Sequence, residues 1–200
     1  MKFMQLAVTV IMASLLQSGC GRSSPSSYYI LDGGSPPAQE SISMASTLRV
    51  AMVNVPDYLN RNNIVSREPG SNRLILADFH LWAEPLSNGV RRVMQGLLAG
   101  LLRDQKIDVI SNGSDQDADF VLELDIHNLD GNFGGNATLS ATWTLFGKNA
   151  AAIKSGEFVA QSPVPGKSYD MLVNAESKVI RAMAEDVAPS IVAAIRAYKK

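Results

Sequence analysis

The fold is decided by residues 58–102, which read YLNRNNIVSREPGSNRLILADFHLWAEPLSNGVRRVMQGLLAGLL. Two short apolar runs flank the turn sequence Glu68-Pro69-Gly70-Ser71-Asn72, and this turn chemistry predicts a β-hairpin. Pro85 suits the first turn of a helix, because a missing N–H costs nothing there. After Pro85, apolar residues recur with helical spacing as far as Leu102. A helix with one apolar face must pack on a sheet, and the hairpin is the nearest one.

The rest of the chain adds strands and a second helix. Residues 120–127 and 137–145 alternate apolar and polar side chains around a glycine-rich turn, which predicts an antiparallel hairpin. Residues 168–197 carry a helical stripe, and Pro189 is expected to kink or interrupt that helix. Shorter strands are expected at 28–31, 48–55, 107–111 and 157–160. We therefore predict an α/β fold of the α+β type, a mostly antiparallel sheet with two main helices on one face, in a single domain.

Composition excludes several classes of function. The chain has 200 residues, of which 46% are hydrophobic and 18% charged, as expected for one folded domain. The net charge of -1 gives no basic excess, so nothing indicates nucleic-acid binding. The single cysteine excludes an internal disulfide and a cysteine-rich metal site. Two histidines leave little room for histidine-based catalysis.

The N-terminus resembles a bacterial lipoprotein signal. Residues 1–19 combine a positive start with an apolar run that is too short to span a bilayer comfortably. Ser18 and Gly19 precede Cys20, as small residues do in a lipobox, whereas Gln17 departs from the usual apolar residue. The alternative is an ordinary signal peptide with an incidental cysteine. We favour lipidation, because Cys20 is the chain's only cysteine and stands where a lipobox needs it.

Lipidation of Cys20 would place the protein on a membrane. Covalent diacylglyceryl and N-acyl chains anchor firmly, since each buried CH₂ adds about 0.8 kcal/mol. Gly21 stands where lipoproteins retained in the inner membrane of enteric bacteria carry Asp, so we expect the periplasmic face of the outer membrane. Residues 20–27 then form the lipidated cysteine and a Ser/Pro-rich tether, and residues 28–200 form the folded domain.

The sequence of the domain gives little indication of catalytic or metal-binding residues. Glu123, Asp125 and His127 alternate along one strand face and could bind a divalent metal, although a solvated strand face is the simpler interpretation. A general-acid role for His80 would need a second partner and a cleft, and the sequence shows neither. We therefore predict no catalytic residue, no metal site and no cofactor beyond the lipid on Cys20.

Several segments resemble the PqiC-like lipoproteins, also called ABC-type transport auxiliary lipoproteins. The lipobox stands where that family has one, and the resemblance covers nearly all of the mature chain. Gln17 and His80 are small departures. The matching segments are 55–59 (VPDYL), 81–86 (LWAEPL), the hairpin around 130–144 with Trp143-Thr144-Leu145 at its end, and 169–173 (YDMLV).

The resemblance implies a non-catalytic docking subunit at the outer membrane. Its partner would be an MCE-domain, PqiB-like protein, a tunnel that crosses the periplasm and is thought to carry lipids, including phospholipid. The lipoprotein would hold the tunnel's outer end as a homo-oligomer and so support membrane integrity. Tyr58, Arg61 and Trp82 are our candidates for the partner or oligomer surface, although all three could be structural and core packing is the default for Trp82.

Two other functions stay open at this point. A stand-alone periplasmic lipid-binding lipoprotein would hold lipid in an apolar cavity between sheet and helices. A metal-dependent hydrolase would use Glu123, Asp125 and His127. The first predicts bound lipid in the isolated domain, and the second predicts metal in the purified protein.

Overall fold

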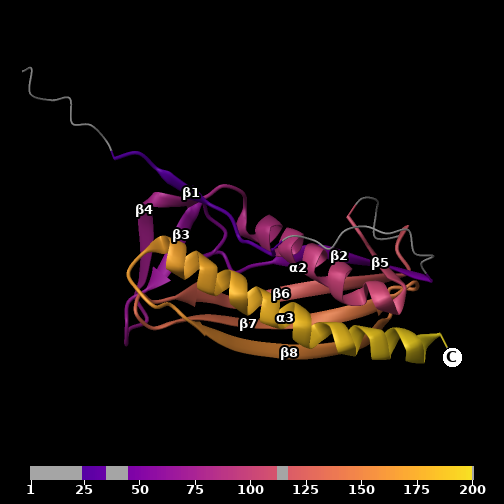
Figure 1. Cartoon of the computed structure of the whole chain (residues 1–200). Coiled ribbons are helices and arrows are strands. Elements are labelled where there is room, and N and C mark those ends of the chain that lie inside the picture. Colours follow the sequence, from indigo (N-terminus) through magenta and orange to yellow (C-terminus); the bar gives the residue numbers. More distant parts are fainter. Residues whose placement is uncertain (1–23, 35–44, 112–116, 200) are drawn as a thin grey trace, which may run out of the picture.

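The computed structural model describes residues 24–34, 45–111 and 117–199. Eight strands form one mixed sheet, and two long helices lie on it (Figure 1). The strands are β1 (Ser27–Tyr29), β2 (Ser46–Asn54), β3 (Asn63–Arg67), β4 (Leu74–Trp82), β5 (Ile107–Ile110), β6 (Phe120–Gly131), β7 (Asn136–Gly147) and β8 (Ala152–Pro163). The helices are α2 (Leu86–Leu102), the 3₁₀ turn η1 (Arg103–Gln105) and α3 (Tyr169–Tyr198).

Both predicted hairpins form. β3 pairs with β4 across the turn at residues 68–73, and β6 pairs with β7, both antiparallel. β8 adds a third long antiparallel strand beside β7, so it is far longer than the predicted strand 157–160. The sequence did not show the parallel contacts, in which β1 lies beside β4, and β2 lies between β5 and β6. The fold class is confirmed, because the longest pairings are antiparallel.

The two helices cover one face of the sheet, as predicted. α2 packs on β2 and β5, α3 packs on β7 and β8, and the helices contact each other (Figure 1). The layer between helices and sheet is filled with apolar side chains, and Leu98, Leu122 and Met183 have no exposed surface. This continuous core explains why the domain folds as one unit.

Local signals explain where the helices begin. Pro85 directly precedes α2, as its missing N–H allows, and Ser168 caps α3 by accepting a hydrogen bond from the Met171 backbone N–H at 3.3 Å. α3 continues past Pro189, so of the two predicted effects, a kink or an interruption, the interruption does not occur. The surrounding residues Val187, Ala188 and Ile191 are buried, and this packing outweighs the hydrogen bond that proline removes.

Gly96 and Gly100 stand four positions apart on α2, but Gly96 does not serve close packing. A Cβ added at Gly96 would meet nothing within 4 Å. The close approach is instead in the sheet, where a Cβ at Gly156 of β8 would come within 2.9 Å of the ring of Trp143 on β7. Glycine at this position therefore gives the tryptophan ring room to lie flat across the strand.

Candidate functional site

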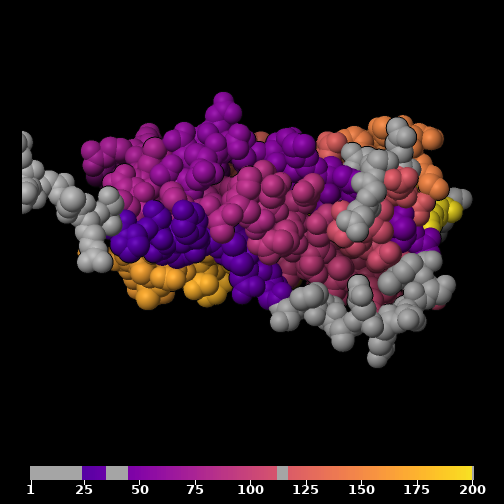
Figure 2. All heavy atoms as spheres, turned by 90° about the horizontal axis from the view of Figure 1, so that it is seen from above, coloured from indigo at the N-terminus to yellow at the C-terminus, as the bar shows by residue number. Residues whose placement is uncertain are grey.

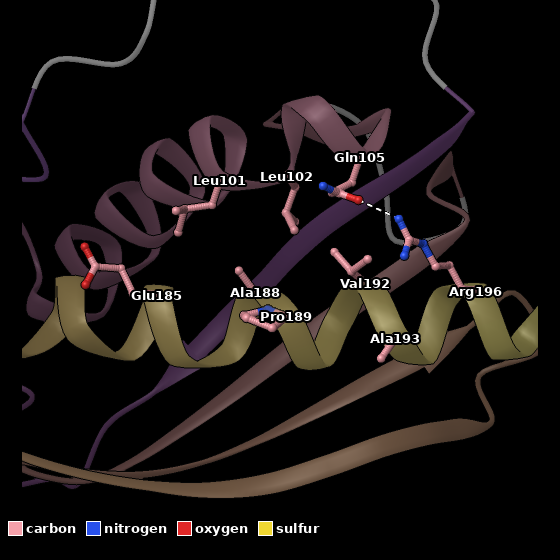
Figure 3. Close-up of a pocket in the computed structure, with 9 residues that line it drawn as sticks. All are labelled: Leu101, Leu102, Gln105, Glu185, Ala188, Pro189, Val192, Ala193 and Arg196. Atoms are coloured by element: carbon pink, nitrogen blue, oxygen red, sulfur yellow. Dashed lines mark hydrogen bonds between the residues drawn. The ribbon is translucent and has the colours of Figure 1, made fainter.

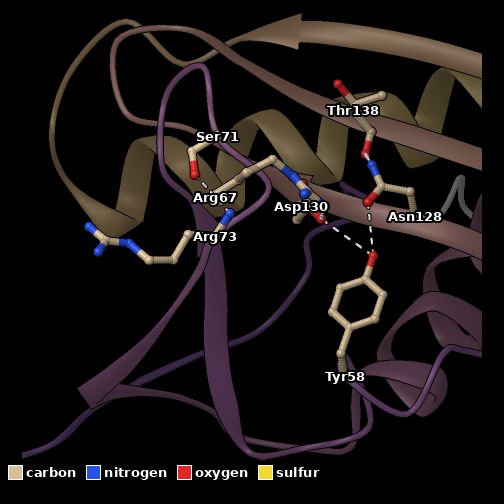
Figure 4. A network of polar contacts seen from close by, with 7 residues as sticks. All are labelled: Tyr58, Arg67, Ser71, Arg73, Asn128, Asp130 and Thr138. Atoms are coloured by element: carbon tan, nitrogen blue, oxygen red, sulfur yellow. Dashed lines mark hydrogen bonds and ion pairs between the residues drawn. The ribbon is translucent and has the colours of Figure 1, made fainter.

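A polar network joins three segments that are distant in sequence (Figure 4). Arg67 at the end of β3 donates to both carboxylate oxygens of Asp130 on β6, at 3.0 Å from Nε and 2.7 Å from Nη2. The Tyr58 hydroxyl donates to Asn128 Oδ1 at 2.9 Å and lies 3.3 Å from Asp130 Oδ2. Asn128 in turn donates to the Thr138 carbonyl on β7 at 3.3 Å. The network therefore ties the loop before β3 to the centre of the sheet.

Burial and charge fix the protonation states in this network. Partial burial, followed by the nearby Asp130 carboxylate, raises the pKa of Tyr58 to about 12. Hydrogen bonding to Asp130 raises the pKa of Arg67 further above its ordinary value. Tyr58 and Arg67 are thus hydrogen-bond donors at neutral pH, and neither can act as a general base.

A buried carboxyl group lies close to this network. Glu176 of α3 is only 1% exposed, and its Oε2 has no hydrogen-bond partner. Burial, and then repulsion from Asp130, raises the pKa of Glu176 well above 4.5. The sequence contained a signal for this residue, because Glu176 stands four residues from both Leu172 and Ile180 on the buried face of α3.

The network opens onto a surface hollow. Its volume is about 320 Å³, and Arg67 and Asp130 form part of its wall. The other lining side chains are mostly neutral amides and hydroxyls, from Asn128, Asn132, Asn136, Thr138 and Gln161. Such a surface can exchange hydrogen bonds with another polar surface, but it offers no nucleophile activated by a base.

A second hollow lies between the two helices (Figure 3). It measures about 380 Å³, and Leu101 of α2 and Ala188 and Val192 of α3 line it. Arg196 closes one end by donating to Gln105 Oε1 at 2.7 Å. This groove is open to solvent and mostly apolar, unlike the hollow beside Arg67.

The three predicted interface residues differ in how deeply their side chains are buried. Arg61 is exposed in the turn before β3, and Tyr58 is half-buried in the network described above. Trp82 ends β4 inside the core with 7% of its surface exposed. Burial of Trp82 favours the packing role that the sequence analysis kept as the default, and Arg61 has the most accessible side chain of the three. Cys20 lies outside the described residues.

The three side chains of the metal hypothesis stand on the helix-free face of β6. Asp125 accepts a hydrogen bond from Asn54 at 2.7 Å, and His127 Nε2 lies 3.2 Å from the Thr142 hydroxyl. Across residues 24–34, 45–111 and 117–199, no group of three or more His, Cys, Asp or Glu side chains could hold a metal ion. His80, in contrast, has a structural role, since it stacks on Tyr169 at 4.1 Å and lies 2.8 Å from the Tyr29 hydroxyl.

The chain was compared with models of known protein families, and one family matches. The model of the ABC-type transport auxiliary lipoprotein component family matches residues 29–188, which include α2, the larger part of α3 and all of the polar network. The chain belongs to this family. The family resemblance inferred from the sequence is thus confirmed, and the role of a transport auxiliary lipoprotein follows from it.

Solved structures confirm the fold of this auxiliary lipoprotein. An uncharacterised protein is 23% identical, with a TM-score of 0.70 over 84% of this chain and 99% of its own. A Xanthomonas campestris protein of family DUF330 is 15% identical, with a TM-score of 0.68 over 87% of this chain and 99% of its own. The PelC dodecamer from Paraburkholderia phytofirmans reaches only 0.41, at 14% identity over 78% of this chain and 94% of its own. No curated protein matches the chain.

Proposed function

We propose that this protein is a lipoprotein held at the periplasmic face of the outer membrane by lipid on Cys20. There it serves as the non-catalytic docking subunit of an MCE-type intermembrane lipid transport system. The observation that carries the proposal is the family match over residues 29–188, which makes the folded domain an auxiliary component of a transporter. The lipobox-like sequence that ends at Cys20 supports the anchor.

The geometry supports docking rather than chemistry. Tyr58 and Arg67 are fixed as donors by their contacts with Asp130, and the hollow beside them is lined by polar side chains. Arg61 extends from the turn that follows Tyr58 and is exposed. We place a contact with the MCE-domain partner or a neighbouring copy at this turn, because its exposed arginine follows three positions after Tyr58, which is held by Asn128 and Asp130.

A crosslinking pull-down from native membranes tests the proposal. The wild-type protein should recover a large MCE-domain protein, and Cys20→Ala should lose it because the domain is no longer held at the membrane. Arg61→Ala should reduce recovery without changing membrane attachment, and Arg73→Ala in the neighbouring hairpin turn is the matched control. Recovery of only the protein itself, or of free lipid, would contradict docking.

One observation supports the alternative of a stand-alone lipid-binding lipoprotein. The groove between α2 and α3 is large enough for part of an acyl chain, and Leu101 and Val192 give it apolar walls. The sheet–helix layer itself is filled by fully buried side chains, so lipid would have to bind in a surface hollow such as this groove. Organic extraction of the purified protein should then release stoichiometric phospholipid, and a Leu101→Glu variant should release much less.

A further inference from the structure

Large apolar side chains are exposed together at one end of the molecule. We define the β1–β4 patch as Tyr28 in β1, Ile30 just after β1, and Leu76 and Phe79 on β4. Tyr28 is 66% exposed, and the other three are between 43% and 55% exposed. β1 and β4 are paired neighbours, and both views show these segments at the end opposite the C-terminus (Figures 1 and 2). Exposed apolar groups that gather in this way mark a contact surface.

Strand direction relates the patch to the N-terminal end of the chain. β1 runs parallel to β4, with Ser27 opposite His80. Residues before Ser27 therefore leave β1 in the direction of the earlier part of β4, which carries Phe79. The described chain begins at Ser24 at this same end of the molecule (Figure 1). The described residues before β1, 24–26, thus extend from β1 in the direction of Phe79.

Chain length limits how far the patch can lie from the anchor. Tyr28 is eight residues after Cys20, and a fully extended chain of that length spans at most about 26–29 Å. This is less than the thickness of a bilayer with its headgroups, about 40–45 Å. A lipid on Cys20 would keep the patch at high effective concentration next to the membrane surface.

The chemistry of the patch fits the interface of a phospholipid bilayer. Tyrosine places its ring among acyl chains and its hydroxyl among headgroups, and Ile30, Leu76 and Phe79 supply apolar surface. The charges of the nearby hairpin turn are balanced, because Arg73 pairs with Glu68. The attraction therefore comes from buried apolar area and needs no anionic lipid.

We propose that the β1–β4 patch rests on the phospholipid surface to which Cys20 is attached and orients the domain there. This inference depends on the anchor in the proposed function but not on the transport partner. Tyr169, at the start of α3, stacks on His80 beside the patch. Because α3 has 30 residues, its C-terminal end lies about 45 Å along the helix from this point. The groove lined by Leu101 and Val192 would then face the periplasm, away from the membrane.

Site-specific fluorescence on vesicles tests this orientation. The mature lipidated protein is reconstituted into vesicles of phosphatidylethanolamine and phosphatidylglycerol that contain a nitroxide-labelled lipid. Phe79→Cys and Leu101→Cys, which replace side chains of almost equal exposure at 43% and 42%, are each labelled with an environment-sensitive fluorophore. Cys20 is the only natural cysteine, and its sulfur is blocked by the thioether to diacylglycerol. A label at position 79 should be quenched roughly threefold more than one at 101, because it lies at the acyl boundary.

Each of the other possible results of this experiment would overturn a different part of the proposal. Equal quenching at 79 and 101 in vesicles that carry the protein on flotation would overturn the patch and leave the anchor intact. Failure of the protein to float with vesicles would overturn both. Self-crosslinking through position 79 without quenching would assign the patch to a second copy. Ile30→Cys repeats the measurement at a second position in the patch, and the purified vesicles contain no transport partner.

Discussion

Arg67 on β3 and Asp130 on β6 form a doubly hydrogen-bonded ion pair although 63 positions separate them. Asp130 is 3% exposed, whereas a third of the Arg67 side chain reaches solvent. The pair stands beside the single parallel contact between β3 and β6, which is formed by Ser66 and Gly131. It therefore reinforces the junction between the β1–β4–β3 end of the sheet and the long β6–β7–β8 hairpins.

Removing the Arg67 charge should strongly destabilise the domain. In Arg67→Met the side-chain stem still packs, but Asp130 is left buried without its cation. We expect the free energy of unfolding in urea to fall by about 2–4 kcal/mol, somewhat below the usual cost of breaking a fully buried pair. The matched control is Arg73→Met, whose partner Glu68 is exposed, and it should cost less than about 1 kcal/mol. Similar losses for both variants would mean that burial of Asp130 is not the cause.

Glu176 should make stability fall as pH rises. Its pKa in the folded protein is raised well above the unfolded value of 4.5. The contribution of this group is therefore fully present below pH 4.5 and is lost as pH rises through the folded-state pKa. Glu176→Gln removes the titration, so the variant should gain about 1.4 kcal/mol relative to wild type per pH unit in that window.

Unfolding free energies at several pH values between 4 and 8 measure this difference. Glu185→Gln, at an exposed position on the same helix, serves as the control and should run parallel to wild type. A constant difference between Glu176→Gln and wild type across the range would show that Glu176 keeps its charge in the folded state.

Tyr58 should resist ionisation until strongly alkaline pH. Its folded-state pKa of about 12 lies above the ordinary value of 10, so its stabilising contribution is complete below pH 10 and is lost as pH approaches 12. Tyr58→Phe should lower the free energy of unfolding by about 1–2 kcal/mol at pH 7, because Asn128 and Asp130 lose a donor. Ultraviolet titration of tyrosinate should show one late-titrating tyrosine fewer in the variant, and an unchanged titration curve would contradict this assignment.

The two glycines Gly156 and Gly96 should respond oppositely to alanine. A Cβ at Gly156 meets the Trp143 ring at 2.9 Å, so Gly156→Ala should cost about 1–3 kcal/mol through overpacking. A Cβ at Gly96 meets no atom within 4 Å, so Gly96→Ala should stabilise α2 by about 0.5–1 kcal/mol. Thermal unfolding of both variants compares them directly. A stabilised Gly156→Ala protein would mean that the tryptophan ring can move aside.

Trp82→Ala distinguishes packing from partner recognition. Because the side chain is 7% exposed, its removal should lower the free energy of unfolding by about 3–5 kcal/mol. Arg61→Ala, at an exposed position, should change stability by less than about 0.5 kcal/mol. A Trp82→Ala protein of normal stability that lost its partner in the pull-down would instead restore the interface interpretation.

The periodic segments could be predicted because their signals are local. Alternation along 120–127 and 137–145 corresponds to β6 and β7, and the turn at 68–72 joins β3 to β4. The residues of the candidate site are harder to predict from the sequence. Tyr58 falls within the family-matching segment 55–59, whereas nothing in the neighbours of Asp130 indicates a partner at Arg67.

Local residue patterns were enough to predict the hairpins, the two helices, the lipobox-like motif and the family. Each depends on spacing within a few residues or on a contiguous motif. Such patterns reflect the local geometry of the backbone. The tertiary structure decided the parallel contacts, the ion pair of Arg67 with Asp130, the burial of Glu176 and the position of the β1–β4 patch. These depend on which strands become neighbours, and strand pairing is selected by the free energy of the whole packed core rather than by any one segment.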